Sequence, residues 1–149
     1  MKKRVLFLCA TNGVQSPMAE MLLRRIDPDH FEAHSAGTEP GELHPLTVQV
    51  MNEIGVDLSK SRTRKLEDVR DVDFDFVITL CHRVRSHPLR FNHTELIHWQ
   101  FDDPTADSVD ADRRIRRFRA VRDQIAQRIN LFALVHARRK PAAMAAASR

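Results

Sequence analysis

Residues 5–17 decide the fold, and they read Val5-Leu6-Phe7-Leu8-Cys9-Ala10-Thr11-Asn12-Gly13-Val14-Gln15-Ser16-Pro17. The first four are an apolar run of strand length, and Asn12 and Gly13 can adopt the positive φ angles of a tight loop. Ser16 and Pro17 are typical of a helix start, with a hydroxyl N-cap and a proline at the first helical position. The stretch therefore predicts a strand, a loop and a helix.

The rest of the chain continues this alternation. Strands are predicted at residues 31–35, 74–80 and 95–100, helices at 45–54 and 111–135, a helical piece near 66–69 and an irregular segment at 82–93. Alternating strands and helices pair their strands in parallel, with helices on both faces. We expect an α/β three-layer sandwich, a four-stranded parallel sheet flanked by helices. A single domain is predicted over residues 1–137, and residues 138–149 are predicted to be a disordered, Ala-rich basic tail.

The composition limits the class of protein. The 149 residues, 42% of them hydrophobic, suit one domain with a core. The chain has no run of 18 apolar residues and no signal-peptide core, so we expect a cytoplasmic protein without a membrane segment. Its two cysteines are too few for a disulfide scaffold, which favours free thiols in a reducing compartment.

Basic residues are concentrated at the C-terminal end. Residues 113–149 carry eleven Lys and Arg against one acidic residue, Asp123. A nucleic-acid interface is one interpretation, but no binding motif accompanies the arginines, and aromatic residues for base stacking are scarce. We therefore interpret the region as a solvated helix face with a basic tail and expect no nucleic-acid partner.

Residues that carry chemistry follow the predicted strands. Cys9, Cys81 and Asp103 each come after a strand, and the carboxyl ends of parallel strands form the binding edge of such a sheet. The loop from Cys9 to Ser16 can turn its backbone N–H groups around a tetrahedral anion, with the dipole of the next helix behind them. The same field favours a thiolate at Cys9, and the Ser16 hydroxyl can stabilise it.

The segment around Cys9 resembles the phosphate loop of the low-molecular-weight protein tyrosine phosphatases and of the arsenate reductases built on the same fold. Further stretches are similar to the arsenate reductase branch: His34-Ser35-Ala36-Gly37-Thr38-Glu39-Pro40, His44-Pro45-Leu46-Thr47, Ile54-Gly55-Val56-Asp57-Leu58-Ser59, Val77-Ile78-Thr79-Leu80-Cys81 and His98-Trp99-Gln100-Phe101-Asp102-Asp103-Pro104. Their order and spacing extend the resemblance over residues 4–135.

The resemblance implies an arsenate reductase that converts arsenate to arsenite through a cysteine–arsenate adduct. Within it, Cys9 is the nucleophile, Ser16 stabilises its thiolate, Asp103 is the general acid and Cys81 is the resolving thiol. The oxyanion would be bound by the loop residues Ala10, Thr11, Asn12, Gly13, Val14 and Gln15. No bound cofactor is implied. The implied partners are an arsenate- or phosphate-type oxyanion and an external thiol reductant: glutaredoxin, thioredoxin or a small thiol.

Two features depart from the family pattern. The motif has an arginine at the position of Gln15, and a neutral amide lacks the charge with which a guanidinium binds an oxyanion. The residues considered as sources of a replacement cation are Arg62, Arg64, Arg83 and Arg85. Thioredoxin-coupled members carry a third cysteine soon after the second, and this chain has none there, which excludes a relay of three thiols.

Several alternatives stay open at this point. The chain is also compatible with a phosphomonoesterase acting on phosphotyrosine, or with a catalytically degenerate oxyanion-binding module marked by Gln15. Cys81 is equally compatible with a core thiol, and Asp103 with a simple turn residue. The spacings of Cys81, His82, His87, His93 and His98 fit no compact set of ligands, so we predict no metal site.

Overall fold

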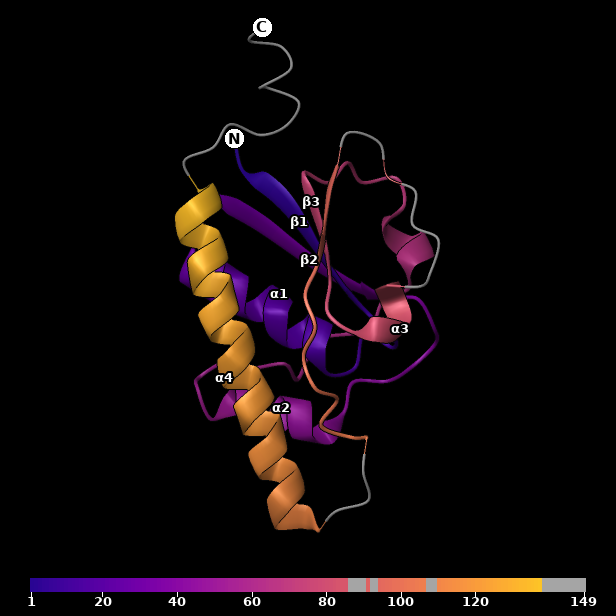
Figure 1. Ribbon diagram of the computed structural model, residues 1–149, viewed down its shortest axis with the longest axis vertical. Coiled ribbons are helices and arrows are strands. Elements are labelled where there is room, and N and C mark those ends of the chain that lie inside the picture. The colour runs from indigo at the N-terminus through magenta and orange to yellow at the C-terminus, as the bar shows by residue number, and fades with distance from the viewer. Residues whose placement is uncertain (86–90, 92–93, 107–109, 138–149) are drawn as a thin grey trace, which may run out of the picture.

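The computed structural model describes residues 1–85, 91, 94–106 and 110–137. Figure 1 shows the arrangement of the helices and strands. In chain order they are β1 (Lys3–Cys9), α1 (Gln15–Ile26), β2 (Phe31–Gly37), α2 (Pro45–Asn52), η1 (Leu66–Val69), β3 (Phe76–Thr79), α3 (His82–Arg85), β4 (Glu95–His98) and α4 (Ala111–His136).

The four strands form one parallel sheet in the order β2-β1-β3-β4. Its register pairs Cys9 with Gly37 across β1 and β2, and Thr79 with His98 across β3 and β4. The carboxyl ends of all four strands therefore meet at one edge. The predicted four-stranded parallel sheet is confirmed.

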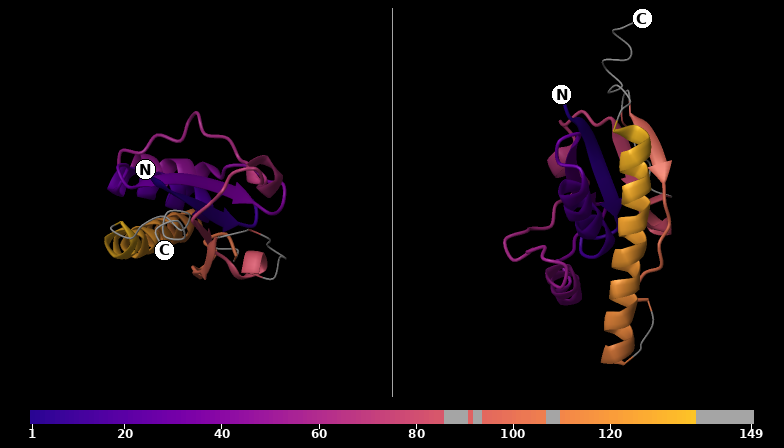
Figure 2. Two further views of the ribbon diagram at one scale, coloured as in Figure 1. Left: turned by 90° about the horizontal axis from the view of Figure 1, so that it is seen from above. Right: turned by 90° about the vertical axis from the view of Figure 1, so that its left-hand side faces the viewer.

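Helices cover both faces of the sheet (Figure 2). On one face, Val5, Phe7 and Cys9 of β1 belong to a core that includes residues of α1, α2 and α4. On the opposite face, Leu6 and Leu8 pack with residues of η1 and α3. Because side chains of a strand alternate between faces, the continuous apolar run of β1 supplies both cores. This confirms the predicted three-layer sandwich.

The start of α1 differs from the prediction. The helix begins at Gln15, its N-cap is Val14 and no side chain caps it, so the prediction of Ser16 as N-cap and Pro17 as first helical residue is wrong. The reason is that the Ser16 hydroxyl lies 2.8 Å from the Cys9 sulfur and is not directed at the helix N–H groups.

Other boundaries differ by a few residues. The second helix begins at Pro45 as predicted, with His44 Nδ1 accepting from the N–H of Leu46 at 3.0 Å, and Gly55 follows its end at φ +82°. β2 is longer than predicted, whereas β3 and β4 are shorter. The prediction of an irregular segment at 82–93 is wrong at its start, because residues 82–85 form the helical turn α3. The tail predicted to be disordered, 138–149, lies outside the described residues.

Part of the basic face of α4 joins this helix to the end of α2. Arg119 and Arg122 pair with Glu53, just after α2, at 2.6 and 2.9 Å, and Arg122 also donates to the carbonyl of Val50 at 2.9 Å. The hydrogen bond from Arg119, supported by that from Arg122, keeps the pKa of Glu53 below its usual value, against the opposing effect of burial. These arginines therefore have a structural role. In the described part of the chain, no helix is long and apolar enough to cross a membrane.

Candidate active site

Cys9 is the last residue of β1, and its side chain is buried at the carboxyl edge of the sheet, with 4% of the residue exposed. Its sulfur lies 2.8 Å from Ser16 Oγ, in the first turn of α1. The Ser16 hydroxyl accepts a hydrogen bond from Asn12 Nδ2 at 2.8 Å, so its own hydrogen can be donated to the sulfur. This geometry suits stabilisation of a thiolate.

Asn12 is the centre of the network that holds this loop. Its φ of +59° is in the left-handed region, which asparagine tolerates better than most residues. Its Nδ2 donates to Ser16 and also to Ser35 at 2.9 Å, and its Oδ1 accepts from the N–H of Arg64 at 2.8 Å. Ser35 in turn donates to Glu20 at 2.8 Å. Sequence reasoning missed the roles of Ser35 and Glu20, although Ser35 stands in one of the stretches that carry the family resemblance.

The loop backbone turns its carbonyls away from the cavity beside Cys9. The carbonyls of Cys9, Ala10 and Gly13 accept hydrogen bonds from the N–H groups of residues 38, 39 and 44 at 3.3, 2.7 and 3.0 Å. In the part of the chain that the structure describes, the N–H groups of residues 10–14 donate to no protein acceptor. Free N–H groups at the start of a helix are the donors that an anion needs.

Gly37 supports the loop from the neighbouring strand. A Cβ atom at this position would lie 2.7 Å from the carbonyl carbon of Thr11, 2.8 Å from the nitrogen of Asn12 and 2.9 Å from the oxygen of Ala10. Only glycine fits such a close approach of two backbones. The curve of the loop therefore depends on the end of β2.

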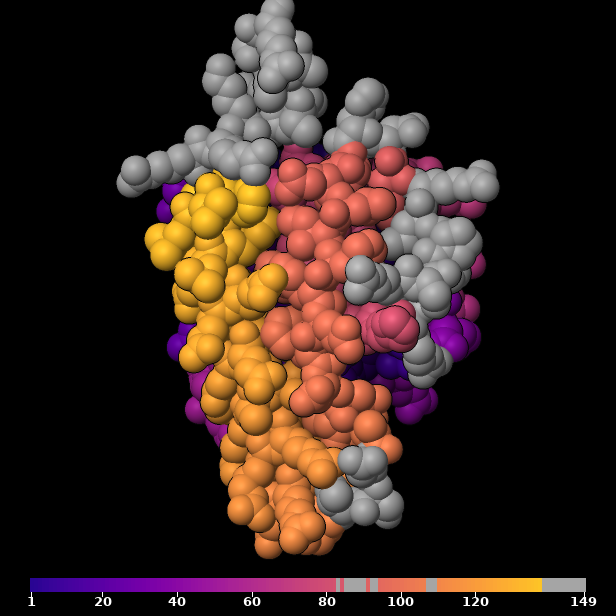
Figure 3. Space-filling view, viewed as in Figure 1, coloured from indigo at the N-terminus to yellow at the C-terminus, as the bar shows by residue number. Residues whose placement is uncertain are grey.

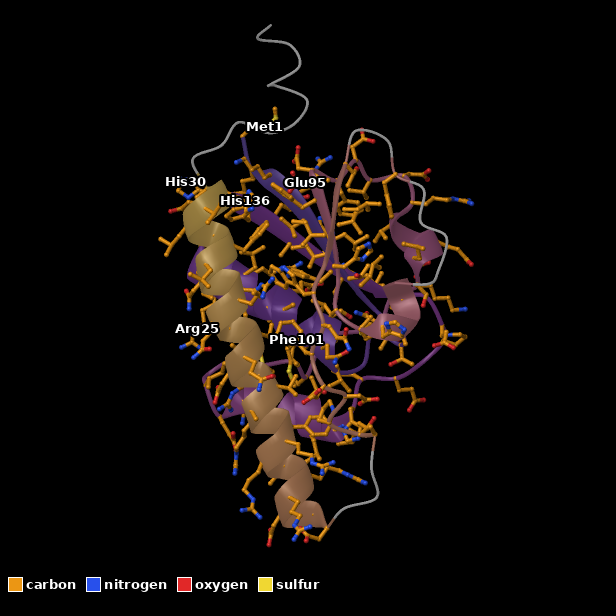
Figure 4. The ribbon with its side chains drawn as sticks, viewed as in Figure 1. Met1, Arg25, His30, Glu95, Phe101 and His136 are labelled. Carbon is orange, nitrogen blue, oxygen red and sulfur yellow. The ribbon has the colours of Figure 1, made fainter. Side chains whose placement is uncertain are left out.

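Gln15 lies beside the loop that follows β4. Its side chain is buried, and Nε2 donates to the carbonyls of Phe101 and Asp102, both at 3.2 Å. Figure 4 labels Phe101, which lies beside the start of α1. The amide of Gln15 thus contacts the backbone of Phe101 and Asp102. These two residues belong to the segment 101–105, which we name the acid loop because it contains Asp103.

Asp103 is an exposed residue of the acid loop. Its Oδ1 accepts from the N–H and the hydroxyl of Thr105 at 2.9 and 2.6 Å, while Oδ2 has no hydrogen-bond partner among the described residues. One carboxylate oxygen therefore orders the turn, and the other is available to a ligand. The turn role and the acid role considered from the sequence are compatible with each other.

One cavity of about 380 Å³ brings most of the predicted residues together. Its lining residues are Cys9, Ala10, Thr11, Val14, Gln15, Cys81, His82, Gln100, Phe101, Asp102, Asp103 and Thr105. Figure 3 shows indigo atoms of the N-terminal segment at the bottom of a hollow between α3 and the chain after β4. Ser16, Asn12 and Gly13 are not among these lining residues. Cys81, directly after Leu80, is half-buried in the same cavity as Cys9.

The arginines considered as replacement cations do not line this cavity. Arg62 and Arg64 line a different cavity of about 700 Å³, which Asn12 also lines. The side chains of Arg83 and Arg85 lie outside the described part. Among the described residues that line the Cys9 cavity, only His82 has a side chain that can carry a positive charge. No group of three His, Cys, Asp or Glu residues suited to a metal ion occurs among the described residues.

These features define a class: an α/β sandwich with a thiol at the end of its first strand, beside a loop with free backbone N–H groups and an acidic turn. The family model described as low molecular weight phosphotyrosine protein phosphatase matches residues 4–142. The chain therefore belongs to this family, as the resemblance of the Cys9 loop predicted. An arsenate reductase of Shouchella clausii is 38% identical over 137 residues, which cover 89% of this chain and 96% of that protein.

Solved structures agree with this assignment. An arsenate reductase of Archaeoglobus fulgidus has a TM-score of 0.72 at 26% identity, over 86% of this chain and 97% of that one. An arsenate reductase in a phosphate-binding state has a TM-score of 0.71 at 28% identity, over 87% and 95%. A thioredoxin-dependent arsenate reductase of Corynebacterium glutamicum has a TM-score of 0.62 at 25% identity, over 87% and 63%.

Proposed function

We propose that this protein is an arsenate reductase that uses Cys9 and Cys81. The observation that carries the proposal is that both thiols and the Asp103 carboxyl line one cavity, beside a loop whose backbone N–H groups are free to bind an oxyanion. The names of the relatives and structural neighbours support arsenate as the substrate over a phosphate ester.

In the first step, the Cys9 sulfur attacks arsenic. A sulfur–arsenic bond forms, one arsenic–oxygen bond breaks, and Asp103 protonates the departing hydroxyl, which leaves as water. The free backbone N–H groups of Ala10, Thr11 and Val14, which line the cavity, hold the remaining oxygens. The hydroxyl of Ser16, 2.8 Å from the sulfur, stabilises the thiolate before the attack.

In the second step, the Cys81 thiolate attacks the Cys9 sulfur. A disulfide forms, the sulfur–arsenic bond breaks, and its electron pair stays on arsenic, which is reduced from arsenic(V) to arsenic(III) and leaves as arsenite. The chain contains two cysteines, so no third thiol within it can accept the disulfide. An external thiol, from thioredoxin, glutaredoxin or a small thiol, must then attack it.

A single turnover of Cys81→Ser tests the assignment. The fully reduced wild-type protein, mixed with arsenate and no added thiol, should release about one arsenite per chain and lose two thiols. Cys81→Ser should release none and lose at most Cys9, as an adduct seen by mass spectrometry. If Cys81→Ser releases arsenite like the wild type, the two-thiol mechanism is wrong. If neither protein reacts with arsenate but both hydrolyse an aryl phosphate, the chain is a phosphatase.

A further inference from the structure

Both N–H donors of the Gln15 amide are hydrogen-bonded to the acid loop. A primary amide carries two N–H donors, and Nε2 of Gln15 is 3.2 Å from each of two carbonyl oxygens, those of Phe101 and Asp102. Because both acceptors are carbonyls, the nitrogen and not the oxygen of the amide must face them. No donor of this side chain is then left for an anion in the Cys9 cavity.

The acid loop packs on the core through Phe101 and the buried Pro104, but it makes few other hydrogen bonds. On its sheet side, the N–H of Phe101 donates to the carbonyl of Leu80 at 3.2 Å. Within the loop, Asp103 accepts from Thr105, and the N–H of Ala106 donates to the Asp103 carbonyl at 3.2 Å. Among the described residues outside this loop, Gln15 is the one whose side chain donates hydrogen bonds to it.

We propose, on the basis of the function proposed above, that Gln15 is a positioning residue that clamps the acid loop onto the Cys9 loop. It acts through Asp103 and does not bind the oxyanion. Gln15 begins α1, in the same turn as Ser16, so the clamp joins the acid loop to the segment that orients the nucleophile. The relative placement of the Cys9 sulfur and the Asp103 carboxyl follows from these two hydrogen bonds.

Gln15 stands where the family motif has an arginine, and the change to a neutral amide has a physical consequence. Different groups then bind the anion and hold the acid loop. The free backbone N–H groups of Ala10, Thr11 and Val14, which line the cavity, bind the anion, and the buried amide of Gln15 holds the loop. A neutral donor suffices for two backbone carbonyls, which carry no net charge. The absence of a Lys or Arg among the described residues that line the cavity agrees with this division.

Hydrogen exchange tests the clamp without any enzymatic activity. Gln15→Met keeps the length of the side chain and removes both donors, and Gln15→Glu keeps its shape and places a carboxylate against the two carbonyls. Either variant should exchange the amides of residues 100–106 about tenfold faster than the wild type, with the remaining core unchanged, because two neutral hydrogen bonds are lost. The matched control is Gln124→Met, on the face of α4 that adjoins the same loop, which should exchange like the wild type. Unchanged exchange at 100–106 in both Gln15 variants overturns the proposal.

Trp99 offers a second readout of the same loop. It is the single tryptophan of the chain, and its ring centroid lies 6.3 Å from that of Phe101, edge to face. The fluorescence of Gln15→Met should be quenched by acrylamide more readily than that of the wild type or of Gln124→Met. Equal quenching in all three proteins contradicts a released loop.

A mutant cycle with Asp103→Asn then separates positioning from anion binding. Gln15→Met should slow formation of the Cys9–arsenate adduct about tenfold, but less than twofold when Asp103→Asn is already present, because the effect passes through Asp103. The dissociation constant of inorganic phosphate should change less than twofold. Equal slowing in both backgrounds, or weakened phosphate binding, shows that Gln15 serves the anion and overturns the proposal. A protein that is inert to arsenate but shows the exchange effect contradicts the proposed function and leaves the clamp established.

Discussion

Cys9 and Cys81 line the same cavity at the carboxyl edge of one sheet, but the fold holds them differently. Cys9 is buried, and its sulfur contacts Ser16 Oγ, which Asn12 holds from behind. Cys81 is half-buried, and its sulfur has no hydrogen-bond partner within the part of the chain that the structure describes. A nucleophile benefits from preorganisation, whereas a resolving thiol has to move to a second position. The two environments match these two tasks.

The largest effect is expected when Cys9, the proposed nucleophile, is replaced. Cys9→Ser should lower arsenite production by about 10⁴-fold or more, because a hydroxyl is a far weaker nucleophile than a thiolate. Steady-state arsenite release with an excess of dithiol measures it. Thermal unfolding should be close to that of the wild type, since the substitution changes one buried atom. Retention of a tenth of the activity would assign the attack to another group.

The next largest effect should come from Asn12→Ala. This substitution removes three hydrogen bonds and places alanine at φ +59°, at a total cost of about 3 kcal/mol in the free energy of unfolding. Urea titration measures the loss. Asn52→Ala, at the exposed end of α2, is the control and should change stability by less than about 0.5 kcal/mol. Equal effects of the two would show that the network does not stabilise the fold.

A smaller and more selective effect is expected for Ser16→Ala. The Cys9 sulfur loses the hydroxyl 2.8 Å away, so its thiolate is less stabilised, and alkylation by iodoacetamide at neutral pH should slow about tenfold. Mass spectrometry resolves the two thiols, and Cys81 serves as the internal control because its rate should not change. Slowing of both thiols would indicate a general change of structure.

The smallest effect concerns His44, which joins the Cys9 loop to α2. Its N–H donates to Gly13 and its Nδ1 caps the helix. Burial, followed by the charge of Arg114, lowers its pKa, and Asp103 opposes this only in part. Above the ordinary histidine value of about 6.5, both the folded and unfolded forms are neutral. As pH falls below it, the unfolded chain binds a proton first, so stability is lost.

His44→Asn keeps a capping acceptor and does not titrate. Between pH 7.5 and pH 5.0, its melting temperature should fall about 2 °C less than that of the wild type. The comparison is made by calorimetry in matched buffers at constant ionic strength. An identical fall in both proteins would mean that other groups carry the acid sensitivity.

The sequence alone was sufficient for the architecture, because the apolar runs and the signals at helix starts are local. The strand predicted at Val5–Leu8 and the helix predicted at 111–135 are confirmed as β1 and α4. The placement of Cys9, Cys81 and Asp103 at one sheet edge followed from the order of the strands. The family resemblance added the roles of these residues, which stay predictions.

Long-range polar contacts could not be predicted in the same way. Asn12 donates to Ser35, and Ser35 donates to Glu20, only after β2 and α1 have packed beside the loop, and no local rule predicts these two contacts. The Ser16 cap was a wrong prediction for the same reason: the local rule favours a cap, but the contact with Cys9 competes for the hydroxyl. The direction of the Gln15 amide depended on where the chain after β4 passes.

The close approach of Gly37 has a consequence for protein engineering. The conformation of the seven residues from Cys9 to Gln15 is not determined by these residues alone, because the end of the neighbouring strand packs directly against their backbone. Grafting that heptapeptide onto a foreign scaffold would transfer the thiol but not the curved conformation of the loop. A transplant would have to carry a glycine on the adjacent strand, the serine two residues before it and a donor for the asparagine oxygen, so the smallest portable unit is a piece of tertiary structure.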